Sequence, residues 1–402
     1  MVITARSVCP HRRAEQGDPM DFRLSEEQEM VRQTARSFAE KELKPGVAER
    51  DEKGEFPTQQ VKMLAELGFM GMIVSEQYGG SGFDTVSYVT ALEEFARIDA
   101  STEIICSVNN SLVCYPLEKF GSDYVKENFL TKFASGEWLG AFCLTEPGSG
   151  SDAVAMKTRA VKDGGEWVIS GSKNFVTNGS NANGYVLVCV TDPDAGARGT
   201  STFIVPRDSK GLSIGKHENK MGIRATDTVS LTLEDVRVPN DYLLGEHGDG
   251  FKQMLSALDS GRLGVAAQGL GIAQGAMEES LQYSTEREQF GKPIAAFQAI
   301  RNKVADMATR IEAARLLLRY AAWKKDAGLR FSQEAAMAKV YCSETATQVA
   351  LEAVQIHGGY GYTKDYPVER MLRDAKITEI YEGTNEVQRI VIARNLYDDR
   401  NK

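Results

Sequence analysis

The feature that most constrains this chain is a change of hydrophobic period, from helical to strand-like and back to helical. Residues 24–140 are patterned as helices, and Ser25 has the type and spacing of a helix N-cap. Short β-branched runs come next, each bounded by turn residues, until about residue 250. From Val304 to Leu318 apolar residues then recur at three- and four-residue steps. These patterns predict a mostly α protein with a central β domain.

The length of the chain, 402 residues, predicts more than one domain, because single cores seldom grow beyond ~250–300 residues. We expect an N-terminal α-helical domain at residues 20–140, a middle β-barrel-like domain at 141–250 and a C-terminal four-helix bundle at 251–402. Residues 1–19 differ in sequence pattern from the residues that follow and are interpreted as a disordered extension. The four bundle helices are expected near residues 251–285, 298–327, 332–356 and 385–397.

Composition argues against several classes of function. The net charge is −9, whereas a nucleic-acid-binding surface is basic. No apolar run approaches the ~20 residues of a membrane-spanning helix. The six cysteines form no CxxC pair and the four histidines form no HxH or HExxH motif, so no metal site is expected. Dilute cysteine in a long chain is typical of a reducing compartment.

Two strand ends carry an aromatic residue followed closely by threonine. They are AFCLTEPGSGSD, residues 141–152, and NFVTNG, residues 174–179. Aromatic rings offer apolar contact and threonine hydroxyls donate hydrogen bonds, so the two strands together form a candidate wall for a flat ring. The glycines after Glu146 fit either a tight turn or an anion cradle, although no Lys-Ser/Thr comes after them to make a P-loop.

The glycines at Gly269 and Gly271 suggest a dinucleotide fingerprint, but the pattern fails. Gln274 occupies the third glycine position, and the stretch lies inside a helical run rather than after a strand. We expect these small residues to allow close packing of helices.

Three charged or glycine-rich segments each have a structural and a functional interpretation. Arg287 in REQFG is either a solvated charge or a bidentate phosphate ligand. Asp259 and Arg262, spaced i,i+3, form either a local ion pair or part of a substrate pocket. The segment QIHGGYGYTKDYP, residues 355–367, is either a helix C-cap or a buried loop.

The segment TEIYEGTNEVQR, residues 378–389, places a carboxylate beside apolar neighbours. Glu382 stands between Tyr381 and Gly383 and close to Ile380. A surface glutamate is the ordinary interpretation of one such residue. A poorly solvated carboxylate is the alternative, and it would be a stronger base.

Taken together, these motifs and their order resemble the acyl-CoA dehydrogenase family from about Met20 to the C-terminus. The nearest subgroup is the short-chain, butyryl-type dehydrogenases, which SVNNSL (residues 107–112) and LDSGR (residues 258–262) are similar to. The resemblance implies three domains, a homotetramer built as a dimer of dimers, and non-covalent FAD. It also implies α,β-dehydrogenation of acyl-CoA thioesters, with electrons passed to electron-transfer flavoprotein. The expected compartment is a prokaryotic cytoplasm, with the mitochondrial matrix as the alternative.

The resemblance also assigns residues. Glu382 matches the catalytic base, and substrate would contact Ser151, Asp259, Arg262, Tyr381 and Gly383. FAD would contact Phe142, Leu144, Thr145, Ser151, Phe175, Val176, Thr177, Arg287, Phe290, Gln298, Gln355, Ile356, His357, Gly358, Gly359, Thr384, Asn385 and Glu386, with Arg287 and its neighbours reaching partly across a subunit boundary.

The chain departs from the family pattern at a few positions. Phe142 and Phe175 stand where the family usually has Tyr and Trp, and His357 replaces a commonly apolar residue. Ser260 and Gly261 occupy the positions where some relatives carry the base. A dehydrogenase of branched or alicyclic short acyl groups, a flavin acyl-CoA oxidase and a non-catalytic binding protein of the same fold remain alternatives.

Overall fold

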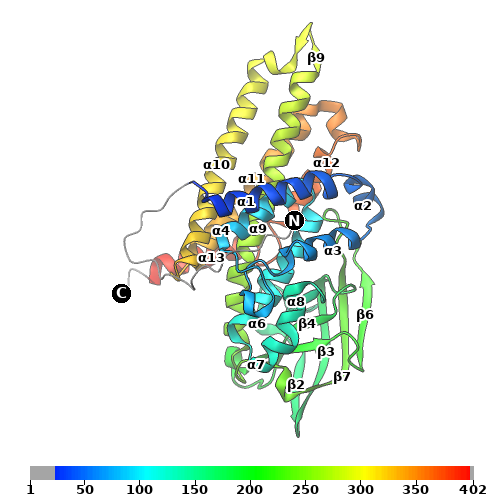
Figure 1. Ribbon diagram of the computed structural model, residues 1–402, viewed down its shortest axis with the longest axis vertical. Coiled ribbons are helices and arrows are strands. Elements are labelled where there is room, and N and C mark those ends of the chain that lie inside the picture. Colours follow the sequence, from blue (N-terminus) through cyan, green and yellow to red (C-terminus); the bar gives the residue numbers. More distant parts are fainter. Residues whose placement is uncertain (1–22, 399–402) are drawn as a thin grey trace.

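The computed structural model describes residues 23–398, so the predicted extension at residues 1–19 lies outside the described part of the chain. The chain passes from helices into a sheet and back into helices, which confirms the predicted fold class (Figure 1). The sheet occupies one end of the molecule. The helices α9 (Gly250–Glu286) and α10 (Gln298–Asp326) extend to the other end.

The N-terminal block is helical. Ser25 caps the first helix as predicted: its side chain accepts a hydrogen bond from the Gln28 N–H at 3.2 Å, while Gln28 Oε1 accepts one from the Ser25 N–H at 2.9 Å. The α-helices are α1 (Glu26–Phe38), α2 (Val47–Lys53), α3 (Thr58–Glu66), α4 (Thr85–Ala96), α5 (Ala100–Val108), α6 (Tyr115–Phe120), α7 (Asp123–Val125) and α8 (Thr131–Ser135). Short π or 3₁₀ segments are η1 (Ala39–Leu43), η2 (Phe69–Gly71), η3 (Glu76–Tyr78), η4 (Asn109–Cys114) and η5 (Lys126–Leu130).

Within the described residues, eight strands form one mixed sheet in the order β6-β7-β3-β2-β4-β5-β8, with β1 parallel to β4. The predicted hairpin joins β2 to β3 through Gly164, which has a φ of +61°. The strands are β1 (Gly140–Cys143), β2 (Arg159–Asp163), β3 (Glu166–Thr177), β4 (Gly184–Val190), β5 (Thr200–Pro206), β6 (Leu212–His217), β7 (Thr228–Pro239) and β8 (Leu243–Leu244).

The C-terminal block contains the four predicted helices and one more. Besides α9 and α10 it contains α11 (Ser332–His357), α12 (Val368–Ile377) and α13 (Asn385–Asp398). Helix α12 is the one that the sequence patterns did not predict. A small hairpin, β9 (Glu288–Gln289) with β10 (Lys292–Pro293), joins α9 to α10 at the tip of the molecule. No helix among residues 23–398 combines the length and apolarity needed to cross a membrane.

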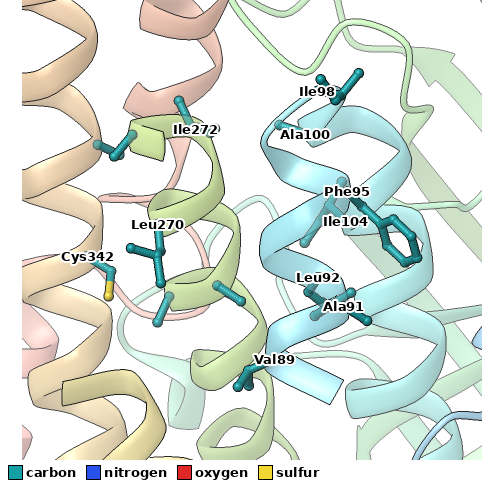
Figure 2. Close-up of a cluster of buried hydrophobic side chains, with 14 of the residues drawn as sticks. Val89, Ala91, Leu92, Phe95, Ile98, Ala100, Ile104, Leu270, Ile272 and Cys342 are labelled. Carbon is teal, nitrogen blue, oxygen red and sulfur yellow. The ribbon is translucent and has the colours of Figure 1, made fainter. Parts of the chain in front are cut away.

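The main core lies where α4 and α5 pack on α9, with α11 on the other side of α9 (Figure 2). Glycines on α9 allow this contact. A Cβ on Gly271 would lie 2.4 Å from the Glu93 carbonyl oxygen, and one on Gly269 would lie 3.0 Å from the Cys342 carbonyl oxygen. The packing interpretation of these glycines is therefore confirmed.

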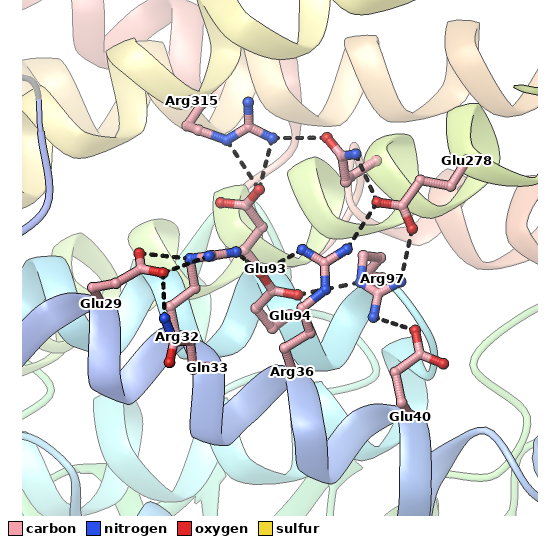
Figure 3. Close-up of polar contacts among 11 residues, drawn as sticks. Glu29, Arg32, Gln33, Arg36, Glu40, Glu93, Glu94, Arg97, Glu278 and Arg315 are labelled. Carbon is pink, nitrogen blue, oxygen red and sulfur yellow. Dashed lines mark hydrogen bonds and ion pairs between the residues drawn. The ribbon is translucent and has the colours of Figure 1, made fainter.

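An ion-pair network connects η1, α4 and α9 (Figure 3). The buried Arg97 guanidinium contacts carboxylates of Glu40, Glu94 and Glu278 at 2.6, 3.2 and 2.7 Å. Because these three glutamates come from η1, α4 and α9, one arginine ties together three parts of the chain.

Candidate active site

Glu382 lies in the loop between α12 and α13, in a left-handed backbone conformation. Its φ is +53° and that of Gly383 is +92°. A positive φ costs a non-glycine residue about 1–3 kcal/mol, so the surroundings must hold it. Gln388 Nε2 donates to the carbonyl oxygens of Glu382 and Gly383 at 3.1 and 2.9 Å. Lys339 Nζ donates to the Gly383 carbonyl and to Asn385 Oδ1, both at 3.0 Å.

The Glu382 carboxylate is packed against α9. A Cβ on Gly261 would lie 2.0 Å from Glu382 Oε2 and 2.9 Å from Leu112 Cδ2. The absence of a side chain at Gly261 is therefore what gives the carboxylate its place. Oε2 is buried and has no hydrogen-bond partner among residues 23–398. A buried oxygen left in this state is an acceptor for a proton or a ligand.

Burial raises the pKa of Glu382 to about 7, against the opposing pull of the Lys339 and Arg262 charges. The Lys339 side chain is itself fully buried, and that burial lowers its pKa to about 7. A carboxyl group with a pKa near the working pH suits general-base catalysis. This combination favours the interpretation of Glu382 as a base over a surface glutamate.

Tyr381 points into the interface of α5 and α9. Its hydroxyl donates to Gln268 Oε1, and Gln268 Nε2 donates to the Ala100 carbonyl at 2.8 Å. Lys339 and Gln268 were not among the residues predicted from the sequence. Lys339 interrupts the apolar run AAMAKVYC of α11, and a charged residue inside such a run is the signal that could have marked it.

Asp259 and Arg262 form the ion pair that the structural interpretation of their spacing predicts. Ser332 Oγ also donates to Asp259, which links α11 to α9. Arg262 Nε is nevertheless buried without a partner among the described residues, and the Arg262 charge acts on Glu382. The pair thus lies beside the candidate base, as a substrate-facing role would require.

The two aromatic–threonine strand ends come together. The Asn174 N–H donates to the Thr145 carbonyl at 2.7 Å, which joins the end of β1 to β3. Phe142 is half-buried, whereas Phe175 has a φ of +54° and is 61% exposed. Leu144, Thr145 and Thr177 are half-buried, and Val176 is buried. An exposed phenyl ring beside threonine hydroxyls fits an apolar planar ligand with polar edges, such as a flavin ring.

Hydrogen bonds of Lys173 and Glu146 hold the base of the turn after β1. Lys173 Nζ donates to Glu146 Oε1 at 2.8 Å and to the Leu144 carbonyl at 3.1 Å. The Glu146 carboxylate also accepts the N–H groups of Lys157 and Thr158. Gly148 and Gly150 have open space around them, and Ser151 is exposed. The turn is therefore rigid at its base and open at its tip.

The remaining predicted cofactor residues lie elsewhere. Arg287 and Phe290 are in the hairpin at the tip of α9 and α10, Phe290 being 92% exposed, and Gln298 begins α10. The Arg287 guanidinium lies 5.6 Å from the Tyr360 ring centroid, beside the end of α11. There Gln355, Gly358 and Gly359 are exposed while Ile356 and His357 are buried.

The chain thus holds its predicted cofactor residues in two groups. The sheet group lies on and just after β1 and β3, and the tip group lies at and near the β9–β10 hairpin, which is at the tip of the molecule (Figure 1). Thr384, Asn385 and Glu386 follow the candidate base after Gly383, where α13 begins at Asn385. One copy of the chain does not bring the two groups together. No cluster of His, Cys, Asp and Glu able to hold a metal occurs among residues 23–398.

The chain is similar to known proteins along most of its length. Three family descriptions match in order: acyl-CoA dehydrogenase N-terminal domain at residues 25–137, middle domain at 141–236 and C-terminal domain at 248–397. The short-chain specific acyl-CoA dehydrogenase of Clostridium acetobutylicum is 48% identical over 94% of this chain and 100% of its own.

Two solved structures are also similar. Butyryl-CoA dehydrogenase of Megasphaera elsdenii superposes with a TM-score of 0.93 at 46% identity, over 94% of this chain and 100% of its own. A chain from the structural study of the electron transferring flavoprotein of Acidaminococcus fermentans gives a TM-score of 0.93 at 48% identity, over 94% of this chain and 99% of its own. The chain therefore belongs to the acyl-CoA dehydrogenase family.

Proposed function

We propose that this chain is an FAD-dependent dehydrogenase that converts short-chain acyl-CoA thioesters to trans-2-enoyl-CoA, with Glu382 as the base. The observation that carries the proposal is the buried, unpartnered Glu382 Oε2, on a carboxyl group whose pKa is about 7. Support for the short acyl group comes from the short-chain relative and the butyryl-CoA dehydrogenase structure. Branched or alicyclic short acyl groups remain alternatives.

FAD would be held by the sheet group of one copy and the tip group of another. When bound, it supplies the acceptor for the β-hydride. Phe142 and Phe175 would contact the flavin ring, Thr145 and Thr177 would hydrogen-bond its polar edge, and Arg287 would bind the pyrophosphate. Ser151, Asp259 and Arg262 would line the thioester arm.

The chain's own contribution is proton removal and charge stabilisation. The N–H of Glu382 donates to no other group among residues 23–398, so it is free to donate to the thioester carbonyl. Such a donor stabilises the charge that develops on the carbonyl oxygen as the α-proton leaves. The carboxylate of the same residue takes that proton, and Tyr381 with the bound acyl group excludes water.

The test is Glu382→Gln, assayed with butyryl-CoA and an artificial electron acceptor. We expect normal flavin content and normal thioester binding, with turnover reduced by at least ~10²-fold, the lower end for a general base. The same substitution at the exposed Glu27 serves as the control. Turnover of Glu382→Gln close to that of the unmodified protein would rule out the assignment.

The partners and setting belong to the same proposal. Electron-transfer flavoprotein is the expected acceptor, supported by the matching chain in the study of the A. fermentans flavoprotein. A homotetramer built as a dimer of dimers is expected from the family, and the separation of the two groups of cofactor residues in one copy supports a site shared between copies. A prokaryotic cytoplasm is the expected compartment, supported by the bacterial relative.

A further inference from the structure

Glu103 is a buried carboxyl group that the chemistry above does not use. It lies on α5, its relative exposure is 0%, and neither carboxyl oxygen has a hydrogen bond of normal geometry among residues 23–398, although the Gln268 amide is close enough to lower its pKa. Leaving such a group unpaired costs free energy, so an unpaired one indicates a partner that comes from outside the chain.

The position of Glu103 results from the antiparallel contact of α5 with α9. Gly261 on α9 faces Leu112, and a Cβ on Gly264 would lie 2.1 Å from Ser107 Oγ. One further turn along, Gln268 bonds to Ala100, one turn before Glu103. These contacts form a strip along α9 from Gly261 to Gln268. The Glu382 carboxylate lies at the Gly261 end of the strip. Glu103 lies at the Gln268 end, two turns or about 10 Å along α9.

The charge of Glu382 at one end of the strip affects the pKa of Glu103 at the other end. Burial raises the pKa of Glu103 well above its ordinary value, and the charge of Glu382 raises it further, while the Gln268 amide opposes both. Tyr381, the residue before the base, reaches the same point through its bond to Gln268. Burial and the Glu382 charge both favour the protonated form of Glu103, and a protonated carboxyl group can both donate and accept a hydrogen bond.

We propose that Glu103 is a specificity-determining residue at the far end of the acyl pocket, where it binds the terminal hydroxyl of an ω-hydroxyacyl group. This rests on the proposed function, because the acyl group must begin at Glu382. A short alkyl acyl group that begins at Glu382 would end before Glu103, which lies about 10 Å further along α9. A longer alkyl group presses a methyl against an unpaired carboxyl group, whereas a hydroxyl of equal size satisfies it.

The test uses a series of ω-hydroxyacyl-CoA thioesters of increasing length, each paired with the alkyl thioester that has a methyl in place of the hydroxyl. In the unmodified holoenzyme, kcat/KM should favour the hydroxyl member at least about tenfold once the chain reaches Glu103. Glu103→Leu should reverse this preference and raise kcat/KM for the longer alkyl thioesters. Glu103→Gln, which still donates and accepts, should keep part of it.

Two controls separate the explanations. Glu279 on α9 is half-buried, and its burial raises its pKa too, so Glu279→Leu makes the same change about three turns beyond Gln268 and should leave the ratio unaltered. The melting temperature of Glu103→Leu should equal or exceed that of the unmodified protein, because a leucine leaves no unpaired polar group. A clear fall would assign Glu103 a structural role and overturn the proposal.

An unmodified enzyme that favours the methyl member at every length, or a ratio unchanged in Glu103→Leu, would also overturn it. Turnover of butyryl-CoA by the unmodified enzyme reports the proposed function separately. If butyryl-CoA is oxidised but no hydroxyl preference exists, only the inference about Glu103 fails.

Discussion

At the scale of single residues, the candidate site depends on three residues: Glu382 in the loop before α13, Gly261 on α9 and Lys339 on α11. Glu382 has a strained φ, Gly261 leaves space for its carboxylate, and Lys339 holds the carbonyl of the next residue. The sequence could single out Glu382 only through the resemblance of its segment, residues 378–389, to a family motif, because its neighbours alone also fit a surface glutamate. Sequence patterns could not identify Lys339, which approaches the loop from α11 only after the bundle has packed.

The charge of Lys339 predicts a pH effect. With the Glu382 pKa at about 7, kcat/KM for butyryl-CoA should rise with pH through that value, because the base works when ionised. Lys339→Met removes a positive charge that lowers this pKa, so the midpoint should move to higher pH. A full pH profile measures the shift.

The same substitution at the exposed Lys210 is the control and should leave the midpoint in place. An unchanged midpoint in Lys339→Met, with normal flavin content, would contradict the electrostatic role of Lys339.

Gly261 predicts a steric effect. In Gly261→Ala the new methyl group occupies the position of Glu382 Oε2, so the carboxylate must move. Misplacement of a catalytic group by about 1 Å can cost ~10²-fold, and we expect a loss of kcat of that order. Steady-state kinetics with butyryl-CoA measure it. Gly165→Ala is the control and should leave kcat unchanged, because its added Cβ meets open space. A Gly261→Ala variant with normal kcat would contradict the prediction, because it would show that the packing tolerates the methyl group.

At the scale of elements, the long helices were the most predictable part. The starts and ends of α9, α10 and α11 lie within two residues of the expected positions, because long apolar stripes specify them. The helix α12 escaped prediction, because Pro367 and the glycine–aromatic run before it have the composition of a loop. The segment itself has a helical apolar spacing, since Val368, Met371 and Ala375 share one buried face, and α12 packs on α9 and α11.

The Arg97 network carries a stability prediction at this scale. Arg97→Met leaves Glu94 buried without its closest partner and releases η1 from α9. Removing one member of a buried pair costs ~3–5 kcal/mol, but Glu94 keeps Arg32 at 3.3 Å, so we expect a clear fall in the free energy of unfolding that stays below this range. Chemical denaturation measures it. Arg237, whose two ion pairs on the sheet are exposed, is the matched control, and Arg237→Met should change stability little.

At the scale of the whole molecule, the separation of the two cofactor groups matters most. Motifs along the chain could indicate both groups, but their distance apart depends on how far α9 and α10 extend beyond the sheet, which no local pattern encodes. Arg287→Ala should therefore lower FAD retention even though it lies far from Glu382. The flavin-to-protein absorbance ratio after dialysis measures retention, with the exposed Arg198→Ala as control. Unchanged flavin content would argue against a shared site.

The exposed phenyl ring of Phe290 and the arginine beside it, carried on a projecting tip, have a practical consequence. In the proposed function FAD is held by two copies of the chain, so it is retained only as long as the copies stay together, and mass action governs its loss. Dilution alone should then bleach a yellow preparation, and concentrating it with added flavin should restore the colour.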